Sequence, residues 1–432
     1  MIGKARKIRD YKNLTKELPT LRYVDPERVY INLDTSRCKE CGLSVAKGAY
    51  VKVGQVIGER QGGFFTQPVY STISGHVEGI VKKMDPSGEE KDFVVIRNDY
   101  KDTYDPSITD RPDSVIESMT KKDIIDVIKE KALIGLGGSG FPTYVKLSSN
   151  EDIHTVVINA VECEPYLSSD YRLIKDRPEQ IFNGLKYLMQ ASGAKKGVIA
   201  VKKTKTDLIE VLEKELMRFK DLDITIAKLK DYYPQGWEVE VFKNALGITI
   251  PSGQLPMKYG LLMFNVSTTQ SVYEAIKHNL PITKRYVTVN GDAIKFPQSI
   301  RVRVGTSVKD LIRLSDGYKE DAEEVEIVMG GPMMGTAVPT DDVVVTPLTT
   351  SILVFKTKEY KEEPCVRCAS CVINCPVDIQ PVQIMNAVKR NDKKAAMNLD
   401  AKKCIECGLC TYVCTSKIEV TDYVKQAKKL IG

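Results

Sequence analysis

Long apolar runs are missing from this 432-residue chain. None approaches the roughly 18–20 residues that a membrane-spanning helix needs, so we expect no transmembrane segment. The N-terminal residues, MIGKARKIRDYKNL, lack the apolar core of a signal peptide. These two absences predict a cytoplasmic protein in a reducing compartment, where cysteine usually serves metal ligation or redox chemistry.

Strong charge imbalance and histidine clusters are missing too. Lys and Arg exceed Asp and Glu by only 63 − 57 = +6, which argues against a nucleic-acid binder. The three histidines, His76, His154 and His278, show no metal-ligand spacing. With 42% apolar and 28% charged residues, the chain has the composition of a globular protein, and wholesale disorder is excluded.

Changes of pattern along the chain predict an α/β multidomain fold. Apolar runs and amphipathic stretches alternate in the second quarter of the chain, which predicts a parallel sheet covered by helices. We predict five segments: an extended arm (1–30), a barrel-sandwich β unit of the lipoyl type (31–100), this α/β domain (113–250), a β-grasp module (255–355) and a cysteine-rich domain (361–432).

Turn signals support the two β-rich segments. Short β patterns broken by Gly and Pro fill residues 51–96. In the β-grasp segment, Asn290-Gly291 lies between alternating apolar residues, which predicts a hairpin with these two residues at its tip.

Eight of the 11 cysteines form two runs with identical spacing. Each run reads C-x2-C-x2-C-x3-C, the pattern of a ferredoxin with two clusters, in which the fourth cysteine of one run ligates the other cluster. Two zinc sites are the alternative, but zinc does not require two duplicated four-cysteine runs. We therefore predict two [4Fe–4S] clusters, one held by Cys365, Cys368, Cys371 and Cys414, the other by Cys404, Cys407, Cys410 and Cys375.

A glycine-rich loop precedes the first predicted strand of the α/β domain. Gly135, Gly137, Gly138 and Gly140 lie in GLGGSG, where backbone N–H groups can approach a phosphate closely and Lys146 can supply a cation. A helix precedes the loop, unlike in a dinucleotide fingerprint, and a plain flexible linker is the alternative.

Acidic residues follow the strand that comes next, at the edge where parallel sheets bind ligands. Glu162 and Glu164 are predicted to alternate off one side of the segment NAVECEP, with room for a ribose or a flavin edge. Cys163 between them is predicted to be a packing residue, because a catalytic cysteine needs a partner.

Taken together, GLGGSGFPTYVKL, NAVECEPYLSSDYRL, YPQGWE, PSGQLP, GGPMMG and the cysteine runs resemble RnfC, the NADH-oxidising subunit of Rnf complexes. More remotely they resemble the flavin subunit of respiratory NADH:quinone oxidoreductase. The resemblance covers about residues 20–432 and implies an SLBB-like β-grasp module and FMN as cofactor. It implies that the glycine loop and Lys146 hold FMN, with Asn159 and Asn265 near the flavin. It further implies that Glu162, Glu164 and Glu238 face NADH.

A C-x-x-C pair, Cys38 and Cys41, departs from the Rnf pattern. The flanking Arg37 and Lys39 favour a lowered thiol pKa and reversible dithiol–disulfide exchange. The alternatives are a zinc site and a pair of reduced surface cysteines with no redox role. The departure resembles the branch associated with D-proline reductase, PrdC, which implies electron transfer from this dithiol to that enzyme.

Three functions are therefore in competition. The first is an NADH-dependent electron-transfer flavoprotein that serves proline reductase. The second is the peripheral NADH-input subunit of a membrane Rnf complex, held by other subunits. The third is a non-enzymatic iron–sulfur carrier or scaffold, which Trp237 favours because the respiratory subunit has an acidic residue there.

Overall fold

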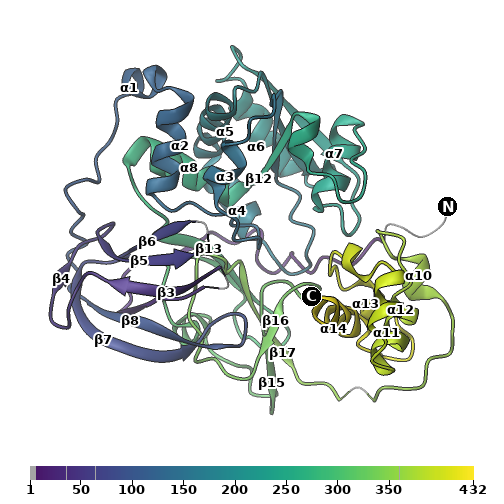
Figure 1. Cartoon of the computed structure of the whole chain (residues 1–432). Coiled ribbons are helices and arrows are strands. Elements are labelled where there is room, and N and C mark those ends of the chain that lie inside the picture. Colours follow the sequence, from purple (N-terminus) through teal and green to yellow (C-terminus); the bar gives the residue numbers. More distant parts are fainter. Residues whose placement is uncertain (1–5, 36, 64, 360) are drawn as a thin grey trace.

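The computed structural model describes residues 6–35, 37–63, 65–359 and 361–432. Figure 1 shows an α/β domain above two β-rich parts, with a bundle of short helices beside them at the C-terminal end of the chain. The mixed α/β multidomain fold predicted from the sequence is confirmed.

The α/β domain contains a four-stranded parallel sheet in the order β11-β10-β9-β12. Its middle strand β9 (Thr155–Asn159) is buried on both faces because helices cover both sides. Val156 and Ile158 join one core and Val157 the other. The remaining elements are α1 (Asp113–Ser118), α2 (Lys121–Glu130), α3 (Thr143–Leu147), α4 (Ser169–Asp176), α5 (Pro178–Ser192), β10 (Lys196–Lys202), α6 (Thr206–Leu216), β11 (Asp223–Leu229), α7 (Glu238–Leu246), η1 (Pro256–Tyr259), β12 (Leu261–Asn265) and α8 (Val266–His278).

Two small antiparallel sheets enclose the core of the N-terminal β unit. One has the order β2-β8-β7-β4 and the other β3-β5-β6. Alternating apolar residues such as Val29, Ile57 and Val94 point into the shared core. The strands are β2 (Arg28–Asn32), β3 (Cys38–Leu43), β4 (Tyr50–Val51), β5 (Val56–Gly62), β6 (Thr66–Tyr70), β7 (Gly75–Met84) and β8 (Glu90–Asn98).

A six-stranded sheet, β1-β14-β13-β17-β15-β16, forms the β-grasp part. Its elements are β13 (Lys284–Asn290), β14 (Gln298–Arg303), α9 (Val308–Leu314), β15 (Val325–Met329), β16 (Thr336–Val338), β17 (Ser351–Lys356) and β1 (Leu21–Tyr23). The strands β13 and β14 pair antiparallel as predicted, but Asn290-Gly291 is not a two-residue tip, because the pairing starts at Val289 and Gln298. Instead, the buried Asn290 side chain donates to the carbonyl oxygen of Tyr166. This contact explains why an asparagine stands at the end of β13.

The predicted N-terminal arm is tied down. Residues 1–5 lie outside the described part of the chain. Further on, Arg6 pairs with Tyr233, Lys12 is buried, and β1 adds a parallel strand to β14. The arm is therefore held by two other parts of the molecule, the α/β domain and the β-grasp part.

Short helices form the cysteine-rich end. They are α10 (Ser370–Ile373), α11 (Pro381–Lys389), α12 (Lys393–Asn398), η2 (Ala401–Lys403), α13 (Leu409–Tyr412) and α14 (Val420–Ile431). Ile384 of α11 and Val424 of α14 are fully buried in one small core. This core fixes the loops that carry the cysteines.

Candidate functional site

The glycine-rich loop is closed on itself by backbone hydrogen bonds. Gly135 N–H donates to the carbonyl oxygen of Phe141 at 2.8 Å, and Gly140 N–H donates to that of Gly135 at 3.0 Å. Gly138 and Gly140 have φ values of +102° and +58°, a region that favours glycine. A side chain at Gly137 would meet Asn265 at 3.0 Å, so the loop lies directly against the start of α8.

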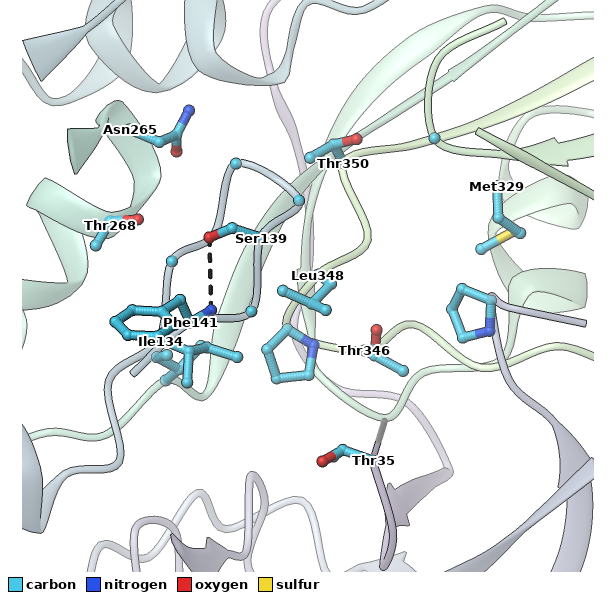
Figure 2. Close-up of a pocket in the computed structure, with 18 of the residues that line it drawn as sticks. Thr35, Ile134, Ser139, Phe141, Asn265, Thr268, Met329, Thr346, Leu348 and Thr350 are labelled. Atoms are coloured by element: carbon cyan, nitrogen blue, oxygen red, sulfur yellow. Dashed lines mark hydrogen bonds between the residues drawn. The ribbon is translucent and has the colours of Figure 1, made fainter. Parts of the chain in front are cut away.

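A cavity of about 940 Å³ opens beside this loop. Figure 2 shows the loop with Asn265 and Thr268 on one side and Thr35 and Leu348 on the other. The structure brings every residue predicted to bind FMN or NADH to this cavity, namely Gly135, Gly137, Gly138, Gly140, Lys146, Asn159, Glu162, Glu164, Glu238 and Asn265. Trp237 also lines it.

Two asparagines mark the carboxyl edge of the parallel sheet. Asn159 and Asn265 are aligned in register at the ends of β9 and β12. The Asn159 amide donates to the carbonyl oxygen of Gly236 at 2.9 Å. Asn265 caps α8 by accepting from Ser267 N–H at 2.8 Å. Parallel strands that end together therefore position these two amides at the cavity.

Lys146 is already paired on the cavity wall. Its ammonium group lies 3.3 Å from the Glu238 carboxylate and donates to the carbonyl oxygen of Met263 at 2.9 Å. The glycine loop, this lysine and the two asparagines form a polar cradle that fits the phosphate and polar edge of FMN.

Glu162 is a buried residue of the cavity wall. It takes a left-handed conformation, with φ of +44°, and its carboxylate is only 4% exposed. Lys12 of the arm lies 3.2 Å from this carboxylate, and Lys205 lies 3.5 Å from it. Both Glu162 and Glu164 line the cavity, but the charge of Glu162 is balanced by two lysines that the sequence did not predict. Neither lysine had a local sequence signal, since Lys12 is 150 residues away.

Burial dominates the electrostatics around Glu162. It lowers the pKa of Lys205 to about 8, with a further contribution from the nearby Lys12 charge, although the Glu162 carboxylate opposes the shift. Lys205 otherwise has no hydrogen-bond partner among the described residues.

Glu164 connects the cavity to the cysteine-rich part. Its carboxylate accepts from Met333 N–H at 3.1 Å and lies 3.4 Å from the Tyr233 hydroxyl oxygen. Tyr233 donates to the carbonyl oxygen of Cys407 at 2.8 Å. Burial raises the pKa of Glu164 to about 7, so this carboxyl group titrates near neutrality. Cys407 itself lines the cavity.

Cys375, the last cysteine of the first run, lies close to three cysteines of the second run. The Cys375 thiol raises the pKa of Cys404, Cys407 and Cys410, in each case after the larger effect of burial. The four thiols therefore share one environment, as the crossed pattern predicts. Their donor set fits a four-iron cluster.

The first cysteine run is far more open. Cys365 and Cys368 are exposed, whereas Cys371 and Cys414 are partly buried and pack against one small apolar cluster. Among the described residues, no three Cys, His, Asp or Glu side chains converge on a single metal ion. Each group contains four thiols, the number of donors that a [4Fe–4S] cluster needs.

The extra cysteine pair lies on β3, away from both runs. Cys38 pairs with Gly62 and Cys41 with Arg60, and a bulge between them brings both residues to the same face of the strand. Burial raises the pKa of both thiols, although the nearby Arg60 opposes the shift. The predicted lowering of the thiol pKa by flanking cations is therefore wrong, because desolvation outweighs it.

Cys163 packs as predicted. Its sulfur lies 2.9 Å from the position that a side-chain carbon at Gly236 would take, and it contacts the apolar cores on both sides. Burial raises the pKa of this thiol.

None of the described helices has the length and apolar character to cross a membrane.

Four domain families match the chain in sequence. Residues 5–101 match the RnfC barrel-sandwich hybrid domain and residues 128–274 the Nuo51 FMN-binding domain. Residues 286–337 match the SLBB domain and residues 364–418 the 4Fe-4S dicluster domain. These matches agree with the predicted order of the parts and support FMN and two [4Fe–4S] clusters as cofactors.

Solved structures with a similar fold include NAD⁺-reducing [NiFe]-hydrogenase. The hydrogen-reduced form has a TM-score of 0.51 at 16% identity, over 74% of this chain and 62% of that chain. The air-oxidised form has a TM-score of 0.52 at 15% identity, over 74% and 65%. At these identities the likeness concerns the fold alone.

Curated relatives are more similar in sequence. A subunit of the Na⁺-translocating ferredoxin:NAD⁺ oxidoreductase complex of Acetobacterium woodii is 36% identical over 88% of this chain and 85% of its own length. Its proton-translocating counterpart in Clostridium ljungdahlii is 31% identical over 86% and 81%. The corresponding subunit of the ion-translocating oxidoreductase complex of Rhodobacter capsulatus is 30% identical over 89% and 74%. Together with the match to the RnfC barrel-sandwich domain, these relatives show that the chain belongs to the RnfC family.

Proposed function

We propose that this chain exchanges electrons with NADH as the peripheral subunit of a membrane ion-translocating Rnf complex. The relatives named above are subunits of such complexes, which favours this partner over proline reductase. The observation that carries the proposal is the cavity itself, because the glycine loop and Cys407 line the same space. A nucleotide site therefore borders directly on an iron–sulfur site.

The residues have distinct roles in this proposal. Gly135, Gly137, Gly138, Gly140, Lys146, Asn159 and Asn265 hold FMN. Glu164 and Glu238 face NADH, whereas Glu162 acts mainly as a buried counter-ion that fixes the strand end. FMN supplies the exchange between a two-electron hydride and single electrons, which the clusters carry.

The exposure of the cysteines suggests the order of transfer. The group Cys375, Cys404, Cys407 and Cys410 lies next to the cavity and is the entry side. The group with the exposed Cys365 and Cys368 is the exit, where a partner can approach. Electrons from NADH therefore enter at the cavity and leave at the first cysteine run.

Flavin bleaching tests the proposal. Full-length protein loaded with FMN and both clusters should lose its flavin absorbance when NADH is added without oxygen. A protein with intact clusters and flavin that NADH does not bleach would instead be the non-enzymatic carrier. Pull-down of other Rnf subunits by the full chain, compared with pull-down of proline reductase, identifies the acceptor.

A dithiol exit remains a second candidate because the bulge brings Cys38 and Cys41 to one face of β3. Such an exit needs a Cys38–Cys41 disulfide that takes up two electrons and two protons and passes them to an acceptor disulfide. The double variant Cys38→Ser/Cys41→Ser should keep NADH oxidation by an artificial dye but lose transfer to the acceptor. The exposed Lys39→Gln is the matched control, and unchanged transfer in the double variant rules the dithiol out.

A further inference from the structure

The cavity continues beyond the glycine loop into the N-terminal β unit. Asn32, Thr35, Arg37, Arg60 and Gln67 line this extension. In Figure 2, Thr35 lies across the glycine loop from Asn265. The cavity thus has one end at the strand ends of the α/β domain and another at the barrel-sandwich unit.

Arg60 is the central cation of this second end. Its guanidinium group donates to the carbonyl oxygen of Asn32 at 2.5 Å and to the Gln67 side chain at 3.4 Å. Its Nε is buried without a hydrogen-bond partner among the described residues. No carboxylate in the described part of the chain lies within ion-pair distance of Arg60, although the charge of the nearby Asp34 favours the guanidinium. Burial raises the pKa of the neighbouring thiols, Cys38 and Cys41, and so disfavours their charged forms, although Arg60 opposes the shift.

Other cations on the cavity wall are paired. Lys146 has Glu238, Lys91 has Glu89 at 2.7 Å, and Lys131 has Glu130 at 2.8 Å. A cation without a direct ion pair in a partly buried site is costly unless an anion binds there. Arg60 therefore differs from its neighbours in a way that points to an anionic ligand.

Arg37 extends the same positive surface toward the glycine loop. Its guanidinium group donates to the carbonyl oxygen of Ser139 at 3.3 Å and lies 5.5 Å from the centre of the Phe141 ring. No ion pair of Arg37 is found among the described residues. A ligand that starts at the glycine loop meets Arg37 first and Arg60 deeper in the β unit.

We propose that Arg37 and Arg60 form an anion subsite through which the barrel-sandwich unit binds the diphosphate of the pyridine dinucleotide. Arginine suits this ligand because its planar donors match phosphate oxygens. The subsite rests on the proposed function for the identity of the dinucleotide. The phosphate of FMN has the same chemistry, but it belongs with the cradle of Lys146 and the asparagines, on the other side of the loop.

Binding measurements with two nicotinamides test the subsite. Full-length, FMN-loaded protein is titrated with NADH and with dihydronicotinamide riboside, which lacks phosphate. Arg60→Gln should raise the Kd for NADH roughly 10- to 100-fold, as expected for a lost hydrogen bond to a charged group, and Arg37→Gln should raise it less. Neither variant should change the Kd for the riboside. Arg60→Lys should recover part of the NADH affinity.

Arg97→Gln is the matched control, since Arg97 is an exposed arginine of β8 that does not line the cavity. An equal Kd for NADH in wild type and both variants overturns the subsite. Loss of FMN from the Arg60 variant, with the NADH to riboside ratio unchanged, also overturns it and assigns the anion to FMN. If NADH binds in an Arg60-dependent manner but leaves the flavin oxidised, the subsite stands and the proposed oxidation of NADH fails.

Discussion

The two cysteine runs have the same spacing but very different surroundings. In the first run, Cys365 and Cys368 are exposed. In the second run, Cys407 and Cys410 are buried, and Cys407 lines the nucleotide cavity. Identical ligand patterns therefore indicate the same type of cluster, whereas the packing around each run differs, and the proposed function assigns the buried run to the substrate side and the exposed run to the partner side.

A single cysteine substitution in each run should give the largest difference between the two clusters in their reduction by NADH. In Cys407→Ala, NADH should fail to reduce the cluster of the first run, because the entry side is lost, although dithionite still reduces it. In Cys368→Ala, NADH should still reduce the cluster of the second run. Electron paramagnetic resonance after each reductant measures both outcomes.

Flavin content and circular dichroism check that these two variants fold. A Cys407→Ala protein whose first-run cluster is reduced by NADH at the wild-type rate would contradict the proposed order.

The rate at which a chelator removes iron should also differ between the two runs, because their cysteines differ in exposure. A strong chelator should remove iron in two phases, with the first run on the order of tenfold faster, since reactivity follows exposure of the thiolates. Iron release is followed by the absorbance of the chelate. Cys368→Ala should remove the fast phase and leave the slow one. A single phase in the wild type would mean that the two runs are equally accessible in solution.

A smaller effect is expected from Glu164, which is linked through Tyr233 to Cys407 of the second run. Its pKa is raised from 4.5 to about 7, so its contribution to stability is fully present below pH 4.5 and is lost as the pH rises through 7. Glu164→Gln, which cannot ionise, should therefore raise the apparent Tm by a few degrees at pH 8. The difference from wild type should disappear near pH 4.5.

Thermal scans across this pH range measure the Glu164 effect. The exposed Glu210→Gln on α6 is the control and should follow wild type at every pH. A Glu164→Gln protein with the same pH dependence as wild type would show that the pKa of this carboxyl group is not raised in the folded state.

Local patterns predicted most of the fold. Residues 196–202 and 223–229 are strands of the parallel sheet because their runs of apolar residues pack against the covering helices. In contrast, β1 is only three residues long and carries no apolar periodicity, so its pairing with β14 had no signal in the sequence. The Asn290-Gly291 prediction failed because a tertiary contact of Asn290, and not a tight turn, accounts for the position of that asparagine.

The candidate site was predictable where its residues lie within one motif. The glycine loop and the strand ends brought Gly137, Asn159 and Glu164 to one cavity, because each is fixed by local structure. Lys12, Arg37 and Arg60 come from other parts of the chain and reach the site only through packing between domains. The sequence around a single charged residue does not indicate which distant part of the chain it will contact.

The N-terminal arm has a consequence for how the chain is made. Leu21 pairs with Ile300, so this strand has no partner until 300 − 21 = 279 further residues have been synthesised. At roughly 5–20 residues per second, the arm waits about 14–56 seconds on the ribosome. The counter-ion of Lys12, Glu162, is made sooner, after 150 further residues. Residues 21–23 are therefore made long before the strand with which they pair, and they can join the six-stranded sheet only after β14 has been synthesised.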